Sequence, residues 1–241
     1  MRLLITGAST PLGRALAARL HPGHDLRLSD SEAVDGNTES VACDLGHEGS
    51  TDALVEGVDA LIHIPRAAES GDGAAIDAHT RQTYNLLLAA LQAGVRQVIL
   101  ASSLDLFAPY DADMAVNENW RPRPSTDTAT LAPHLAEFVA REFAHDGALK
   151  VLCLRLGHLV DAADADGLPY DPMWLAVSDA ADACAAVLER LQRSWDDPES
   201  GGAPAWAVFH LQHDGPGARF SSRRFKRSFD FTPQTPFEEK A

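Results

Sequence analysis

The chain has 241 residues, of which 45% are hydrophobic and 23% are charged, and its formal net charge is −15. This composition is ordinary for a globular protein, and the acidic balance argues against a nucleic-acid partner, because phosphate binding needs basic surface. No run of about 18 apolar residues is present, so we expect no membrane span and no membrane partner. The apolar part of the N-terminus is too short for a signal peptide, which favours a cytoplasmic protein.

Cysteine and histidine spacing gives no sign of a metal site. Cys43, Cys153 and Cys184 are widely spaced in apolar stretches, with neither a CxxC pair nor a zinc pattern, so we expect buried thiols in a reducing compartment. His210 and His213 are three residues apart, but no cluster with metal-ligand spacing accompanies them. We therefore predict that the chain holds no metal.

Apolar runs bounded by turn residues alternate with helical patterns, which is typical of βαβ units and a parallel sheet. Strands are predicted at Arg2–Thr6, Asp25–Leu28, Glu39–Cys43, Ala60–His63, Gln97–Ser102, Lys150–Leu156 and Ala207–Leu211. Helices are predicted near 11–20, 50–57, 76–94, 131–146 and 178–193, and polar loops at 67–74 and 194–205. Ser178 is a candidate N-cap of the last helix, with Asp179 and Asp182 in its first turn.

These elements predict an α/β fold of the Rossmann type, with a doubly wound parallel sheet. We expect residues 1–160 to form a dinucleotide-binding domain. Residues 161–241 are expected to form a reduced C-terminal region on the substrate or partner side, interleaved with the first part in one compact unit.

The first predicted strand runs into the turn "TGASTPLG", which contains Gly7 and Gly13. A glycine in such a turn can take a positive φ or let a helix pack closely on a strand. The helix that follows offers free N–H groups and a positive dipole end to a pyrophosphate. Asp30 ends the second strand, where a carboxylate accepts hydrogen bonds from an adenosine ribose and repels a 2′-phosphate. The turn therefore indicates NAD rather than NADP, unless it serves only the fold.

At these residues the chain resembles the extended short-chain dehydrogenase/reductase family, in its NAD-dependent epimerase/dehydratase branch. The family pattern TGxxGxxG is matched at Gly7 and Gly13, whereas Thr10 replaces the middle glycine, where we expect it to crowd the phosphates. "CDLGHEGSTDALVEGVDALIHI" resembles the family segment that implies Asp44 and Leu45 beside the adenine. Three later stretches, "HTRQTYNLLLAALQAGVRQVILASS", "VLCLRLGHLV" and "WLAVSDAADACAAVLE", resemble further family segments. The chain is also similar, more weakly, to uronate dehydrogenases.

The resemblance implies a cofactor site that takes NAD. Its candidate residues are Gly7, Ser9, Thr10, Pro11, Leu12, Gly13, Asp30, Asp44, Leu45, Ile64, His79 and His158. His79 stands where the family has asparagine, and Gln82 where it has glycine. Asp105 and Tyr110 follow a predicted strand end and are further candidates for the cleft.

The family's chemistry uses a serine and a Tyr-x-x-x-Lys pair on a helix. The resemblance places Ser103 at the serine and, through "TLAPHLAE", Thr130 at the tyrosine and His134 at the lysine. The pair itself is absent, because the residues four positions after the three tyrosines are Leu88, Met114 and Trp174.

Pro133 bears on how this helix begins. Because proline fits only the first turn of a helix, we expect the helix to start near Leu131 with Thr130 as its N-cap. Threonine is a poor base without strong activation, whereas an imidazole with an ordinary pKa of about 6.5 can act as one. His134 is therefore the candidate substitute base.

Three functions remain open. The chain is an NAD(P)-binding sensor or scaffold without standard hydride transfer, an active NAD-dependent oxidoreductase or epimerase on a sugar or uronic acid, or an interaction protein that binds no dinucleotide. The resemblance implies a homodimer through the helices at 76–94 and 131–146. A C-terminal basic cluster is either a solvated helix face or a site for an anionic ligand or partner, and it consists of Arg219, Arg223, Arg224, Lys226 and Arg227.

Overall fold

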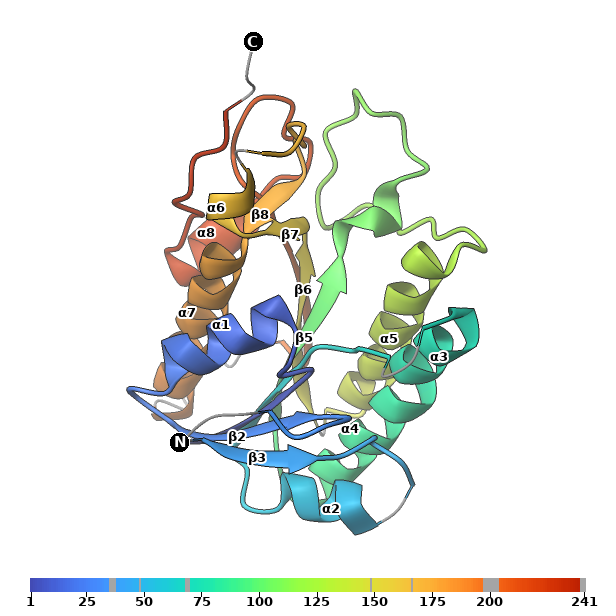
Figure 1. Ribbon diagram of the computed structural model, residues 1–241, viewed down its shortest axis with the longest axis vertical. Coiled ribbons are helices and arrows are strands. Elements are labelled where there is room, and N and C mark those ends of the chain that lie inside the picture. The colour runs from blue at the N-terminus through green and yellow to red at the C-terminus, as the bar shows by residue number, and fades with distance from the viewer. Residues whose placement is uncertain are drawn as a thin grey trace.

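The computed structural model describes residues 1–34, 38–47, 49–67, 70–147, 149–165, 167–196 and 204–238. Within these ranges seven strands form a parallel sheet in the order β3-β2-β1-β4-β5-β6-β9 (Figure 1). The strands are β1 Arg2–Thr6, β2 Asp25–Asp30, β3 Glu39–Ala42, β4 Ala60–His63, β5 Gln97–Ser103, β6 Lys150–Leu156 and β9 Trp206–Leu211. The chain thus winds outward from β1 in both directions, as predicted for a doubly wound Rossmann-type fold.

Helices cover both faces of this sheet (Figure 1). They are α1 Pro11–Leu20, α2 Gly49–Val55, α3 Asp72–Asp77, the π-helical η1 Ala78–Gln82, α4 Thr83–Gln92, the 3₁₀-helical η2 Leu104–Phe107, α5 Thr128–His145, α6 Ala162–Ala165, α7 Val177–Asp196 and α8 Arg223–Phe229. Helices α1 and α7 pack together on one face, whereas α2, α4 and α5 lie on the other. No helix in the described part of the chain is long and apolar enough to cross a membrane.

Alternation of side chains along each strand creates two cores. Leu3 and Ile5 of β1 belong to the cluster under α1 and α7, whereas Leu4 points to the cluster under α2, α4 and α5. All three are fully buried. This two-sided burial explains why the strands appear in the sequence as short continuous apolar runs. The three cysteines are buried and unpaired, as expected.

The strand predictions are confirmed, with ends that shift by one or two residues. The sequence analysis did not find the two short paired strands β7 His158–Val160 and β8 Trp174–Ala176, nor α6. Elements of three or four residues are too short to show a periodicity. Part of the loop predicted at 67–74 is helical, because α3 begins at Asp72. Residues 197–203 of the loop predicted at 194–205 lie outside the described residues.

The single helix predicted at 76–94 is instead three consecutive segments, α3, η1 and α4. Inside this stretch the Thr83 hydroxyl donates to the Ala78 carbonyl oxygen and also contacts a ring nitrogen of His63. A π-helical turn adds one residue to the helical repeat and so turns the following side chains. Here it accompanies a Thr83 side chain that is completely buried against β4.

Two predicted helix caps are wrong. Helix α7 starts at Val177 directly after β8, so Ser178 lies inside the helix. Helix α5 starts three residues earlier than expected, with Asp127 as its N-cap, accepting a hydrogen bond from the Ala129 amide. Thr130 is the third helical residue, and its hydroxyl donates to the Asp127 carbonyl oxygen. Pro133 lies in the second turn, where its missing N–H removes one backbone hydrogen bond, so proline does not mark the start of this helix.

A buried ion pair ties α5 to the sheet. Glu137 of α5 accepts hydrogen bonds from Nε and Nη2 of Arg155 on β6, at 2.8 and 2.7 Å. The hydroxyl of Ser102 on β5 donates to the same carboxylate at 2.6 Å. The Arg155 guanidinium also lies 5.0 Å from the centre of the Phe107 ring. Because both charged side chains are nearly excluded from solvent, the charge of each is stabilised mainly by the other rather than by water.

Replacing Arg155 by methionine would leave the Glu137 carboxylate buried and unpaired. We expect the free energy of unfolding to fall by about 3–5 kcal/mol, measured by urea denaturation at pH 7. The double variant Glu137→Met/Arg155→Met should lose less than Arg155→Met alone, because no charge is then buried. Arg19→Met, which removes an exposed ion pair with Asp182, is the matched control and should cost less than about 1 kcal/mol. Equal losses of unfolding free energy in Arg155→Met and Arg19→Met would contradict this account.

Candidate functional site

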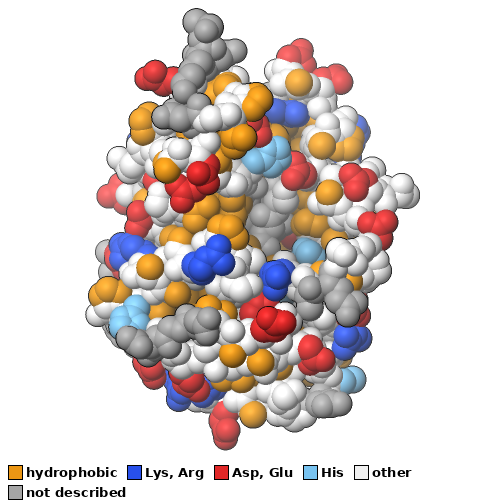
Figure 2. All heavy atoms as spheres, viewed as in Figure 1, with side chains coloured by type: hydrophobic (Ala, Val, Ile, Leu, Met, Phe, Trp, Pro, Cys, Tyr) orange, Lys and Arg blue, Asp and Glu red, His pale blue; other side chains and the backbone are white. Residues whose placement is uncertain are grey.

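A small cavity lies where β1, β2 and β4 end, at the edge of the sheet where parallel strands of this fold bind ligands. Figure 2 shows the hollow on this face, with acidic and basic side chains along its rim. The cavity encloses about 40 Å³, room for one or two water molecules. Five predicted cofactor residues line it, namely Gly7, Asp30, Asp44, Leu45 and Ile64. A nucleoside would therefore need a side chain at this cavity to move aside.

The two glycines of the first turn are required by its geometry. Gly7 has a φ of +66°, and a Cβ on it would lie 2.5 Å from the Ile64 carbonyl oxygen. A Cβ on Gly13 would lie 2.4 Å from the Gly7 carbonyl oxygen. Any side chain at either position would clash, so β1, α1 and β4 approach as closely as the sequence indicated.

Thr10 acts as the N-cap of α1. Its hydroxyl accepts a hydrogen bond from the Gly13 amide at 3.0 Å and donates to the Gly7 carbonyl oxygen at 2.6 Å. Pro11, the first helical residue, has no N–H, and the Leu12 amide, in the first turn of the helix, has no hydrogen bond among the described residues. The turn thus uses part of its own donor set, and Thr10 competes with a phosphate through its hydroxyl as well as its bulk.

Asp30 lies at the end of β2 and is almost completely buried. Its Oδ2 accepts from the Ser9 amide at 3.0 Å and the Ser9 hydroxyl at 2.7 Å, and its Oδ1 accepts from the Ser31 amide at 2.8 Å. Burial by itself would raise the pKa of Asp30, but these hydrogen bonds and the nearby Arg66 guanidinium lower it below its ordinary value. The carboxylate is therefore ionised and holds the glycine turn against β2.

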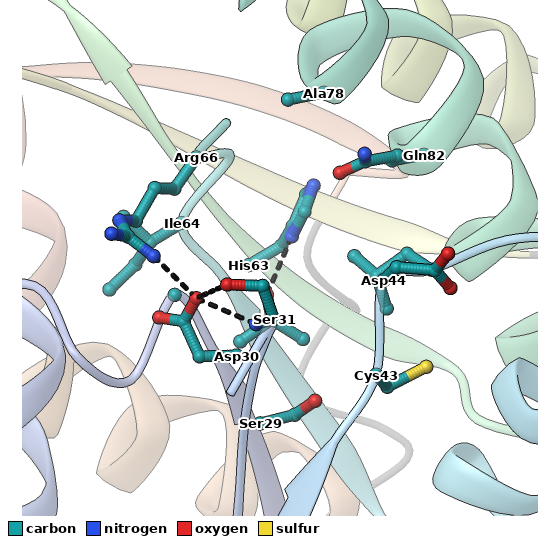
Figure 3. Close-up of a pocket in the computed structure, with 13 residues that line it drawn as sticks. Ser29, Asp30, Ser31, Cys43, Asp44, His63, Ile64, Arg66, Ala78 and Gln82 are labelled. Carbon is teal, nitrogen blue, oxygen red and sulfur yellow. Dashed lines mark hydrogen bonds and ion pairs between the residues drawn. The ribbon is translucent and has the colours of Figure 1, made fainter. Parts of the chain in front are cut away.

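Arg66 is a charged cavity residue that the sequence analysis missed. Its Nη1 donates to Oδ1 of Asp30 at 2.6 Å across the end of β1, and its side chain remains 38% exposed (Figure 3). It follows β4 just as Asp30 ends β2, and these strands flank β1 in the sheet. The rule that parallel strands converge at their carboxyl ends was therefore the signal that could have found it. Because it is partly exposed, Arg66 is the side chain best able to leave.

His63 supports the floor of this cavity as a neutral residue. One ring nitrogen is 2.7 Å from the Thr6 hydroxyl and the other 3.0 Å from the Thr83 hydroxyl. Complete burial lowers the pKa of His63 to about 3. His79 does not line the cavity; its Nδ1 lies 2.8 Å from the Ala75 carbonyl oxygen, and burial lowers its pKa as well.

A second polar cluster lies where β5 ends and β7 begins. Ser103 donates through its hydroxyl to Oδ2 of Asp105 at 2.9 Å. Asp105 Oδ1 lies 2.9 Å from Nε2 of His158, whose Nδ1 lies 2.5 Å from a carboxylate oxygen of Asp171. The hydrogen bond with Asp105, followed by that with Asp171, raises the pKa of His158 to about 9 although burial opposes it. Ser103 and His158, predicted separately, are thus joined through Asp105.

The other catalytic candidates, Thr130 and His134, make no hydrogen bond to this cluster among the described residues. The Thr130 hydroxyl accepts a hydrogen bond from the Ser125 amide at 3.1 Å, and burial is the main cause that lowers the pKa of His134. Among the described residues, no hydrogen bond joins either of them to Ser103. Tyr110 donates to the Arg121 carbonyl oxygen and stacks against Trp120, so it belongs to the loop above the sheet.

The described residues contain no group of three or more histidine, cysteine or acidic side chains placed to hold a metal ion. His210 is completely buried with its ring against Phe107 and Phe220. The His213 ring instead contacts Tyr170, whose hydroxyl lies 3.2 Å from its Nε2. The two histidines therefore face different neighbours.

His158 should titrate far above an ordinary histidine, because Asp105 and Asp171 stabilise its protonated form. Its NMR titration is expected near pH 9, and Asp105→Asn should move the midpoint towards 6.5. The stability that the pair contributes is present below pH 6.5 and is lost as the pH rises through 9. Asp161→Asn, which changes a nearby carboxylate that caps α6, is the control and should leave the midpoint unchanged. A wild-type midpoint near 6.5 would show that the cluster does not hold a cation.

Comparison with known proteins agrees with the fold. The pattern of the NAD dependent epimerase/dehydratase family matches residues 3–167. A uronate dehydrogenase of Pseudomonas syringae pv. tomato is 31% identical over 162 residues, which are 65% of this chain and 58% of that protein. The chain therefore spans less than two thirds of this relative's length.

Solved structures of low sequence identity share the fold. A variant uronate dehydrogenase from Agrobacterium tumefaciens, complexed with NAD, has a TM-score of 0.79 at 23% identity and covers 97% of this chain and 84% of its own. MoeE5 in complex with UDP-glucuronic acid and NAD has a TM-score of 0.77 at 20% identity, covering 98% and 95%. With the family pattern matched over more than half of its residues, this chain belongs to the NAD-dependent epimerase/dehydratase family.

Proposed function

We propose that this chain binds NAD without performing the family's standard hydride transfer, and that it acts as a cofactor sensor or as a scaffold. The observation that carries the proposal is the composition of α5, which holds Thr130 and His134 and neither tyrosine nor lysine. Tyr84 lies on α4, and Tyr110 and Tyr170 bond backbone carbonyl oxygens of Arg121 and Pro216. None of the three tyrosines lies on α5, where a base is needed.

The cofactor preference rests on Asp30. Its ionised carboxylate lies at the end of β2, where it can accept hydrogen bonds from the two ribose hydroxyls and repel a 2′-phosphate. Arg66 occupies part of this acceptor capacity and must swing towards solvent when a ribose binds. NAD is therefore favoured over NADP, at an affinity reduced by the cost of moving Arg66.

A second candidate is an active NAD-dependent oxidoreductase or epimerase on a sugar or uronic acid. Two observations favour this second candidate: uronate dehydrogenases are among the relatives of the chain, and His134 is unprotonated at pH 7. Burial lowers the pKa of His134, so this imidazole is neutral at pH 7 and able to accept a proton. A third candidate is an interaction protein that binds no dinucleotide. The observation that favours it is that the Thr10 hydroxyl already bonds the Gly7 carbonyl oxygen and the Gly13 amide within the glycine turn.

Self-association through α4 and α5 belongs to the same proposal, in a cytoplasmic protein. The two helices pack side by side and expose Tyr84 and Phe138, at 46% and 51% of their surfaces. A partner copy would cover these apolar rings, which the rest of the chain leaves in solvent.

The binding test is a thermal-shift titration with NAD⁺, NADH, NADP⁺ and NADPH. NAD⁺ and NADH should stabilise the protein, by about 2.7 kcal/mol at a hundred times Kd, and the phosphorylated forms should not. Asp30→Ala should weaken NAD⁺ binding about tenfold or more, because hydrogen bonds to a charged group are lost. Glu32→Ala, which changes an exposed acid two residues later, is the control.

The outcomes separate the three candidates. Binding without reduction of NAD⁺ by uronic acids or sugar nucleotides supports the proposal, and turnover abolished by His134→Ala would establish the second candidate instead. If none of the four dinucleotides stabilised the protein, the result would favour the third candidate, the interaction protein that binds no dinucleotide.

Thr10→Gly should increase the affinity for NAD⁺, because it frees the Gly13 amide and removes a Cβ from the turn. One hydrogen bond to a phosphate predicts an increase of about tenfold, measured by calorimetry. Thr10→Ser keeps the hydroxyl and should leave the affinity close to that of the wild type. An affinity that falls in Thr10→Gly would mean that the threonine cap organises the turn for the cofactor.

A further inference from the structure

A cavity outside the cofactor region lies at the end of β9, beside α8. It has a volume of about 460 Å³, within the range of small-molecule sites. None of its lining residues lines the cavity at Asp30. Its walls come from the segment that follows β9, from the first turn of α8 and from Thr232 and Pro233.

Three cations face this cavity in a chain whose net charge is −15. Arg219, Arg223 and Lys226 line it, together with one carboxylate, that of Asp214. The other two cations of the C-terminal basic cluster do not line it: the Arg224 guanidinium lies 5.1 Å from the centre of the Phe209 ring, and Arg227 Nε donates to the Arg223 carbonyl oxygen at 3.4 Å. The cluster is therefore divided between a cavity and an exposed helix face.

Arg219 is held in place before any ligand arrives. Its Nη2 donates to the carbonyl oxygens of Tyr110 and Asp111 at 3.2 and 3.0 Å, and its guanidinium lies 5.1 Å from the Phe220 ring centre. Its Nε is buried and has no hydrogen-bond partner among the described residues. A fixed guanidinium with an unused donor is well suited to a planar or tetrahedral anion.

A buried acceptor lies at the same cavity. Gln212 is 1% exposed, its amide nitrogen donates to the His213 carbonyl oxygen, and its Oε1 has no partner in the described chain. A buried carbonyl oxygen without a donor is costly, and a hydroxyl group would satisfy it. The Ser221 hydroxyl accepts a hydrogen bond from the Arg223 backbone amide, and the Ser222 hydroxyl accepts one from the Gln212 backbone amide. The hydroxyl protons of both serines therefore remain available to an anion.

We propose that this cavity binds the phosphate monoester of a small hydroxylated compound. Three cations against one carboxylate match a phosphate dianion, and the Gln212 oxygen accepts a hydrogen bond from a hydroxyl of the same ligand. The remaining volume, larger than one phosphate group, holds the organic part. The site is separate from the cofactor cavity and does not depend on NAD binding.

Isothermal titration calorimetry on the full chain tests this with three probes, glucose 6-phosphate, inorganic phosphate and glucose. Glucose 6-phosphate should bind, inorganic phosphate should bind more weakly, and glucose should not bind measurably. The titration with glucose 6-phosphate is repeated in saturating NAD⁺, where its affinity should be unchanged. Competition with NAD⁺, or equal binding of glucose, would overturn the proposal, as would no binding of the two phosphates at millimolar concentration.

Two matched double variants test the position of the site. Arg223→Gln/Lys226→Gln removes two cations that line the cavity and should weaken glucose 6-phosphate about tenfold or more. Arg224→Gln/Arg227→Gln removes the same charge from residues of α8 that do not line the cavity and should change the affinity less than about twofold. An equal loss of affinity in both double variants would mean that glucose 6-phosphate responds only to the general surface charge, and this would overturn the position of the site.

Gln212→Met tests the hydroxyl contact. It should weaken glucose 6-phosphate while leaving inorganic phosphate unchanged, and the phosphate result shows that the cavity still folds. An unchanged affinity for glucose 6-phosphate would overturn the assignment of Gln212.

Discussion

The buried ion pair between Glu137 and Arg155 fixes the part of the molecule where a catalytic helix would act. It joins α5 to β6, and the Ser102 hydroxyl adds β5 to the same carboxylate. Two charges without solvent are stable only while this geometry holds, so α5 cannot slide or rotate on the sheet. The positions of Thr130 and His134 follow from that restraint. The helix that holds Thr130 and His134 is therefore fixed on the sheet, although it contains neither tyrosine nor lysine.

Around the cavity at Asp30, the carboxylate and the glycine turn are hydrogen-bonded to groups of the chain itself. Asp30 bonds Ser9 and Arg66, and the Thr10 hydroxyl takes the Gly13 amide. A cofactor must replace these internal bonds, which makes its net gain smaller than the number of its contacts suggests. An apo protein organised in this way is stable without ligand, and under the proposed function a dinucleotide would release Arg66 from Asp30. That behaviour fits a sensor better than an enzyme that holds its cofactor through many turnovers.

Sequence patterns predicted what depends on local periodicity and on backbone geometry. The seven strands follow from buried apolar runs, and Gly7 and Asp30 follow from the turn and strand end that a dinucleotide fold requires. The predicted start of α5 was wrong because the prediction gave Pro133 more weight than the capping side chain of Asp127. Arg66 was missed because its partner Asp30 is 36 residues away, and only the strand order makes them neighbours.

The cavity beside α8 contains buried polar atoms that the described residues leave unpaired. There the chain leaves a buried guanidinium nitrogen of Arg219 and a buried amide oxygen of Gln212 without partners among the described residues. Folded chains pair nearly all buried polar atoms, and each exception calls for an explanation, such as a bound ligand, ion or water. At the cofactor cavity the described residues also leave the Ser29 hydroxyl unpaired, but the Asp30 carboxylate and the Gly13 amide have partners. Beside α8, Nε of Arg219 and Oε1 of Gln212 are unpaired, and a ligand gains these two contacts without first breaking any.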